Sequence, residues 1–101
     1  MPKRSFEVSS YNGKLMAGYL TFGRPGEPSV RTTEPEPGLV VDVAADDRPI
    51  GLEITCPDRV TLEAINRVLV MLGQAPATER ELSLLFASRG GTPDLTPATI
   101  R

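Results

Sequence analysis

The sequence contains no histidine, no tryptophan and one cysteine among its 101 residues. Without histidine, one chain cannot build a Ser-His-Asp triad, a Cys-His pair, a histidine-ligated zinc site or an imidazole proton relay. The single cysteine, Cys56, cannot form a disulfide within the chain. These absences exclude several common catalytic and metal-binding chemistries before any motif is considered.

An excess of charge of one sign is also missing. The 11 basic and 13 acidic residues are interspersed and leave a net charge of -2. This balance gives no electrostatic reason to expect binding to nucleic acid or to an anionic membrane. No apolar run approaches membrane-spanning length, and the first residues lack the apolar stretch of a signal peptide. We therefore expect a cytoplasmic protein with no nucleic-acid and no membrane partner.

The first part of the chain is typical of a β-hairpin. Asparagine-glycine at 12–13, the preferred pair of a type I′ turn, separates strand-like stretches at about residues 5–11 and 14–22. Strict alternation places Leu15 and Leu20 on opposite faces of the second strand. Because both of its faces are partly apolar, we expect this strand to lie inside the sheet.

A short and irregular strand follows. Residues 23–29 combine two glycines with two prolines and indicate a loop. The stretch 30–34 is then a strand candidate, and we expect Pro35 and Pro37 to end it because proline cannot donate a ladder hydrogen bond. An edge strand fits this pattern best.

A second hairpin is predicted over "GLVVDVAADDRPIGLEIT", residues 38–55. A turn centred on residues 47 and 48 would place Asp42 directly opposite Glu53, with both carboxylates on one face. The other face of this hairpin is then continuously apolar, with Leu39, Val41, Val43, Ile50, Leu52 and Ile54.

Two helices are predicted after Pro57. The first begins at the N-cap Thr61 and ends at Gly73, with apolar residues at helical spacing between them. The second begins at Thr78, which has capping-box spacing to Glu81, and ends at the glycine pair 90–91.

Together these elements predict the fold class. We expect an α+β fold, in which two helices pack on one face of a twisted antiparallel sheet of four or five strands. A single domain should cover residues 1–90, with the sheet over 5–56 and a helical hairpin over 61–89. Residues 91–101, with two prolines and little periodicity, are expected to form a flexible C-terminal tail.

Four segments resemble the YuzE-like family of small, mostly bacterial proteins of unknown function. They are Tyr-Asn at 11–12, Ala-Gly-Tyr-Leu at 17–20, Gly-Leu-Val-Val-Asp at 38–42 and Gly-Leu-Glu-Ile at 51–54. The similarity covers about residues 6–56. It implies a small antiparallel sheet with helix on one face, self-association, and a partner-binding role that could be antitoxin-like. No activity comes with the family.

The chain departs from the family pattern at its turns. Asn12 stands where an aspartate is usual, the first turn is shortened, and Asp47-Arg48-Pro49 replaces an aspartate-glycine pair. These differences put any role of the acidic turn residues in doubt.

Asp42 and Glu53 are the candidate ligand-binding residues. A carboxylate pair on one sheet face could bind a divalent cation or do acid-base chemistry, with help from Asp46 or Asp47. We favour the alternative that both carboxylates are solvated or accept hydrogen bonds from backbone, tyrosine or arginine groups, with Arg31 as one partner. No catalytic residue, no metal ligand and no cofactor is assigned.

Three other side chains could be functional or structural. Tyr11 and Tyr19 could stack on a ligand, but two tyrosines in such a chain are more typical of the edge of a core, with their hydroxyls in water. Cys56 could be a nucleophile, but without a histidine it is better explained as a small buried hydrophobe.

The apolar run "VLVML" at 68–72 is the strongest interaction signal in the sequence. Its five residues run right round a helix, so one sheet face cannot cover all of them. Either the second helix buries them or they pair with a second copy, and we favour a homodimer. The candidate interface residues are Val68, Val70, Met71 and Leu72. The function expected is a non-catalytic protein-interaction module; the alternative is a carboxylate-based ligand binder or enzyme.

Overall fold

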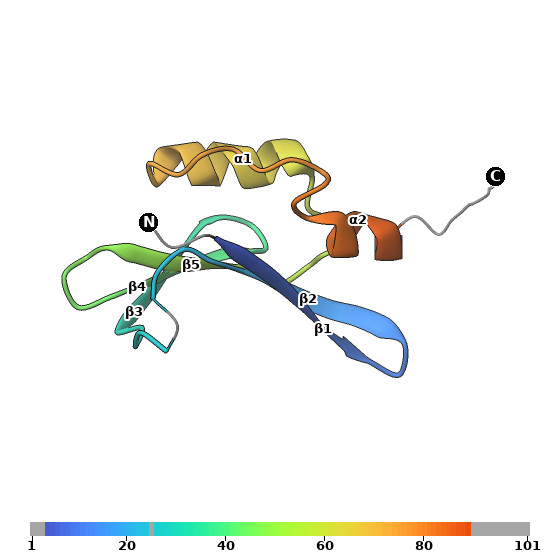
Figure 1. The fold of residues 1–101 in the computed structure, drawn as a ribbon, viewed down its shortest axis with the longest axis horizontal. Helices are drawn as coiled ribbons and strands as arrows, with labels where there is room; N and C mark the ends of the chain where they lie inside the picture. Colours follow the sequence, from blue (N-terminus) through green and yellow to red (C-terminus); the bar gives the residue numbers. More distant parts are fainter. Residues whose placement is uncertain (1–3, 25, 90–101) are drawn as a thin grey trace.

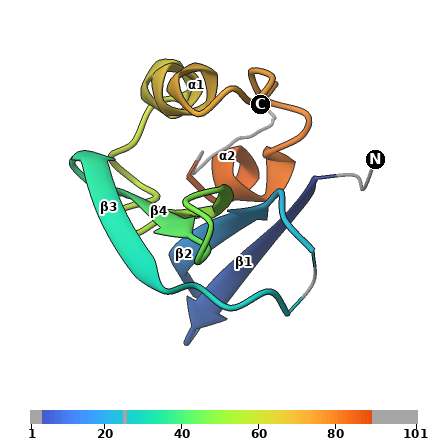
Figure 2. The same ribbon diagram turned by 90° about the vertical axis from the view of Figure 1, so that its left-hand side faces the viewer.

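The computed structural model describes residues 4–24 and 26–89. The tail predicted over 91–101 and the glycine pair 90–91 lie outside the described residues. In the described part, a five-stranded antiparallel sheet in the order β1-β2-β5-β4-β3 carries two helices on one face (Figures 1 and 2), which confirms the α+β prediction. The strands are β1 Ser5–Tyr11, β2 Lys14–Thr21, β3 Arg31–Glu36, β4 Leu39–Val43 and β5 Pro49–Ile54.

The first hairpin turns where the sequence indicates. Asn12 and Gly13 both have positive φ, 52° and 77°, as a type I′ turn requires. The register then shifts, because Ser10 pairs with Leu15 whereas Ser9 pairs with Ala17. Met16 is therefore an extra residue in β2, a β-bulge.

This bulge corrects the face predicted for Leu15. Strict alternation separated Leu15 from Leu20, but Leu15 packs against the same hydrophobic core that contains Leu20. The inserted Met16 resets the alternation of β2, so Leu15 returns to the side covered by the helices. The prediction that β2 lies inside the sheet is confirmed, since β1 and β5 flank it.

The edge strand β3 extends further than predicted. Pro35 lies within it rather than ending it, and the pairing with β4 is irregular between Thr33 and Glu36. A proline is tolerated there because an edge strand needs ladder partners on one side only.

The second hairpin has a register two residues from the predicted one. Asp42 pairs with Gly51 and Val40 pairs with Glu53, so the two carboxylates are diagonal neighbours rather than directly opposite. One cause is the turn, in which Asp47 adopts a left-handed φ of 67° and donates its N–H to the Ala44 carbonyl at 3.0 Å. The other cause lies beside Asp42, where Val43 pairs with Pro49 and Ile50 is an extra residue of β5, a β-bulge. From Leu39 to Asp42 the shift is two, which keeps these side chains on their predicted faces because the side-chain period of a strand is two.

The first helix, α1 Leu62–Met71, has both predicted ends. The Thr61 hydroxyl accepts the Ala64 N–H at 3.1 Å. At the other end, Gly73 has a φ of 77°, and Gln74 donates its N–H to the Leu69 carbonyl at 2.8 Å, which is the Schellman pattern.

The second helix, α2 Ser83–Arg89, begins later than predicted. Thr78 does accept the Glu81 N–H at 3.1 Å, but the residues between form turns before regular helix starts. The segment between the helices runs back along α1 (Figure 1), where the Asn66 amide exchanges two hydrogen bonds with the backbone of Ala77. As a result α1 packs towards β3, and α2 packs on β1 and β2.

A single core fills the space between the helices and the sheet. Its largest fully buried side chains are Leu20, Leu39, Leu52, Ile54, Ile65, Leu69, Leu82, Leu85, Val41 and Val68. Two arginine–glutamate pairs link the helical layer to the two edges of the sheet. Arg67 of α1 bonds Glu36 of β3, and Arg4, just before β1, bonds Glu81, just before α2. The opposite face of the sheet carries no helix in the described chain (Figure 2).

Candidate functional site

Asp42 and Glu53 lie on the helix-free face of the sheet, as predicted. The pairing also places Tyr19 on this face, because Tyr19 pairs with Glu53. On the other side of Tyr19, β1 contributes Glu7. The candidate site is therefore a row of Glu7, Tyr19 and Glu53 across three strands, with Asp42 diagonally beyond it.

Tyr19 crosses the sheet to reach Asp42. Its hydroxyl donates a hydrogen bond to the Asp42 Oδ2 at 2.7 Å. The ring passes over Gly51, where an added Cβ would lie 2.0 Å from the tyrosine oxygen and 2.4 Å from Cζ. Glycine at position 51 is thus required for this contact, because any side chain there would occupy the place of the ring.

The Tyr19 hydroxyl holds its proton strongly. Burial raises the pKa of this hydroxyl well above its usual range, and the hydrogen bond to Asp42 and the negative charges of Asp42 and Glu53 raise it further. A tyrosinate beside two carboxylates would be repelled by both. The hydroxyl therefore stays protonated near neutral pH and acts as a hydrogen-bond donor to Asp42.

The two tyrosines have different environments. Tyr11 is 70% exposed and its ring lies outside the core. Tyr19 is half-buried, and the expectation that its hydroxyl points into water is wrong, because Asp42 accepts it. Asp42 accordingly has one of the hydrogen-bond partners expected for a structural carboxylate.

Glu53 differs from Asp42. No hydrogen bond or ion pair reaches its carboxylate from the part of the chain that the structure describes, and the same holds for Glu7. Glu7, Ala17, Tyr19 and Glu53 border a shallow hollow of about 190 Å³. Glu7 was not among the predicted site residues, although its alternation with Ser5 and Ser9 could have placed it on this face.

Asp46 and Asp47 are engaged in the turn of the second hairpin. Arg31 bonds Asp47 at 2.6 Å rather than Asp42, so Arg31 is not the partner expected for the carboxylate pair. The Arg48 backbone N–H bonds Asp46 and lowers the pKa of its carboxyl group, and the Arg48 guanidinium also pairs with Glu27. Within residues 4–24 and 26–89, no group of three or more acidic or cysteine side chains is placed to hold a metal ion.

The four candidate interface residues separate into two pairs. Val68 is buried in the core, so it is not available to a partner, and Leu72 is half-buried against the core. Val70 and Met71 are 60% and 61% exposed. We call these two side chains the outer side of α1.

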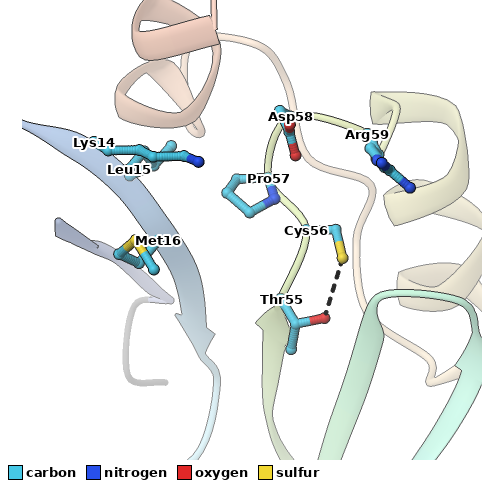
Figure 3. Close-up of a pocket in the computed structure, with 8 residues that line it drawn as sticks. All are labelled: Lys14, Leu15, Met16, Thr55, Cys56, Pro57, Asp58 and Arg59. Atoms are coloured by element: carbon cyan, nitrogen blue, oxygen red, sulfur yellow. Dashed lines mark hydrogen bonds between the residues drawn. The ribbon is translucent and has the colours of Figure 1, made fainter. Parts of the chain in front are cut away.

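A groove lies beside the first half of β2 (Figure 3). Its volume is about 410 Å³; Lys14, Leu15 and Met16 form one wall, and residues 55–59 form the other. It exists because β2 pairs with β5 only from Gly18 onwards, since β5 ends at Ile54 and the chain then turns away. The groove was not predicted from the sequence, because it depends on where β5 ends relative to β2.

Cys56 lies on the wall of this groove and is exposed, so the expectation of a buried cysteine is wrong. Its sulfur is 3.9 Å from the Thr55 hydroxyl, the contact drawn in Figure 3. The turn at Pro57, which redirects the chain towards α1, leaves Cys56 at the surface instead of on a strand face.

Comparisons with protein-family models, with curated proteins and with solved structures found no match to this chain. The resemblance to the YuzE-like family therefore stays a prediction. Among the helices that the structure describes, none is long and apolar enough to cross a membrane.

Proposed function

We propose that this chain is a non-catalytic protein-interaction module that self-associates through the outer side of α1. The observation that carries the proposal is the exposure of Val70 and Met71, adjacent apolar residues on a helix whose inner residues already fill the core. Small domains gain much from burying additional apolar surface, and two-fold pairing is the commonest way to do so.

The helix-free face of the sheet, which carries Asp42 and Glu53, also supports a non-catalytic function. Asp42, one of the two candidate ligand-binding residues, accepts the Tyr19 hydroxyl across Gly51, which is a structural use of that carboxylate. The alternative, a ligand binder or enzyme built on Asp42 and Glu53, would depend on Glu53 and Glu7 alone for free acceptors. A cytoplasmic location and an antitoxin-like partner role, both expected from the sequence, remain parts of the proposal.

Sedimentation velocity on two matched variants tests self-association. Val70 and Val30 are equally exposed, at 60%, and Val30 lies in the loop before β3. We expect the wild type to dimerise at micromolar concentration, Val70→Glu to weaken the dimer by about ten-fold or more, and Val30→Glu to leave it unchanged. A wild-type protein that stays monomeric, or an equal weakening of the dimer by both substitutions, would contradict the proposal. Circular dichroism serves as the control that each variant is folded.

A further inference from the structure

We propose that a pocket between β1 and the loop after β2 binds a small zwitterion of amino-acid type, with Arg24 holding its carboxylate and Glu7 holding its ammonium group. We call this the Arg24 pocket. It lies on the helix-free face of the sheet, where Glu7 and Tyr19 border it, and has a volume of about 360 Å³. The inference goes beyond the proposed function, because it concerns a small molecule and does not involve the outer side of α1.

The loop after β2 forms one wall of the pocket. This loop passes to the side of the sheet away from the helices on its way to β3 (Figures 1 and 2). Its residues Arg24, Gly26 and Glu27 line the pocket together with the paired strand residues Ser5 and Thr21. The volume lies within the range of about 300–1,000 Å³ typical of ligand pockets, so a small molecule fits.

Hydrogen bonds hold this wall in place. The Glu27 N–H bonds the Arg24 carbonyl at 3.1 Å, and the Arg24 N–H bonds the Glu27 carboxylate at 3.2 Å. The guanidinium of Arg48, from the turn of the second hairpin, bonds the same carboxylate at 3.1 Å and so ties the loop to that hairpin. Because the wall is already formed in the chain alone, a ligand does not have to order it on binding.

Three charged side chains border the pocket, and two of them have no bonded partner. The Glu27 carboxylate is paired with Arg48. The Arg24 guanidinium and the Glu7 carboxylate are exposed, and neither receives a side-chain hydrogen bond or an ion pair from the residues that the structure describes. They border one pocket without pairing with each other. A ligand that carries both charges would give each of them a partner.

This combination of charges selects the ligand. A simple anion would be attracted by Arg24 but repelled by Glu7, and a simple cation would be attracted by Glu7 but repelled by Arg24. A zwitterion satisfies both side chains, so attraction and repulsion together favour it over either ion. The hydroxyls of Ser5 and Thr21 can donate to a carboxylate or accept from an ammonium group.

Three matched ligands test the inference. The probe is ε-aminocaproate, and its controls are caproate, which lacks the ammonium group, and pentylamine, which lacks the carboxylate. Titrations followed by two-dimensional amide NMR spectra report both affinity and location. We expect ε-aminocaproate to shift the signals of Ser5, Glu7 and Gly26, and to bind about five-fold more tightly than either control.

Two variants remove one charge each. Arg24→Gln and Glu7→Gln should each weaken the binding of ε-aminocaproate by about two- to five-fold, and the loop keeps its hydrogen bonds because those of Arg24 use its backbone. Arg24→Gln should no longer distinguish ε-aminocaproate from pentylamine, and Glu7→Gln should no longer distinguish it from caproate. Arg80→Gln and Glu63→Gln, the same changes at exposed positions outside the pocket, should bind like the wild type.

Several outcomes would overturn the inference. These are no binding of ε-aminocaproate, equal binding of all three ligands to the wild type, signal shifts confined to residues outside the pocket, and wild-type affinity in both Arg24→Gln and Glu7→Gln. Val70→Glu should leave ligand binding unchanged, and saturating ε-aminocaproate should leave the sedimentation of the wild type unchanged. Failure at the Arg24 pocket and failure of self-association through α1 are therefore distinguishable.

Discussion

The β1–β2 hairpin and the β4–β5 hairpin are both antiparallel, but they differ in burial. Every second residue of β4 is buried, and only Pro49 and Glu53 of β5 are not, whereas β1 has no buried residue and β2 becomes buried only from Gly18. The difference arises because β4 and β5 lie inside the sheet under the helices, whereas the turn end of the first hairpin extends past β5 (Figure 1). The β4–β5 hairpin therefore contributes more buried residues to the core, whereas the turn end of the β1–β2 hairpin is more exposed.

Matched leucine truncations in the two hairpins should give the largest difference in stability. Leu52→Ala removes a fully buried side chain from β5, so we expect it to lower the free energy of unfolding by about 2–5 kcal/mol. Leu15→Ala makes the same chemical change at a half-buried position of β2, so its cost should be less than about half as large. Urea denaturation measures both, and equal losses would mean that the first hairpin contributes to the core as much as the second.

Gly51→Ala should test the hydrogen bond from Tyr19 to Asp42, which joins β2 to β4 across the open face. The new Cβ would collide with the Tyr19 ring, so the ring must move and its hydrogen bond to Asp42 is lost. We expect a loss of about 1–3 kcal/mol of stability.

The same change made together with Tyr19→Ala provides the control. Without the ring there is no collision, so Gly51→Ala should cost much less in that background, which corresponds to a coupling of about 1 kcal/mol or more. Equal costs in both backgrounds would show that the glycine is needed for another reason.

Titration of the tyrosines should give the smallest and most specific effect. Because the pKa of Tyr19 is raised in the folded state, its proton should remain bound as the pH rises through about 10, the usual tyrosine pKa. The unfolded chain loses that proton first, so the associated stability is fully present below about pH 10 and declines above it. Tyrosinate absorbance of the wild type minus that of Tyr19→Phe isolates this residue, and a Tyr19 signal that develops at ordinary pH would contradict the buried hydrogen bond.

The sequence allowed prediction of the features that depend on local chemistry. The Asn12-Gly13 turn, the Thr61 cap and the Gly73 helix end are each specified by residues within one turn of the chain, and all three are confirmed. The face of each carboxylate was also predictable, because it survives a two-residue change of register.

Features that depend on distant strands could not be predicted. The Met16 bulge is visible only against β1, and the register of Asp42 depends on the left-handed conformation of Asp47 and on the extra residue Ile50 in β5. The hydrogen bond from Tyr19 to Asp42 requires β2 and β4 to lie on either side of β5, and strand order has no signature within a single strand.

The pairing of β2 with β5 also has a consequence for the order of folding. Each hairpin closes through a short local turn. The seam between β2 and β5 instead consists of four residue pairs, and even its closest pair in sequence, Thr21 and Gly51, is separated by a long loop. Local hairpins form within about 1–10 μs, whereas contacts distant in sequence require a longer loop to close. We therefore expect the two halves of the sheet to form early and to join late, so that the rate of folding is governed by this narrow seam rather than by either hairpin.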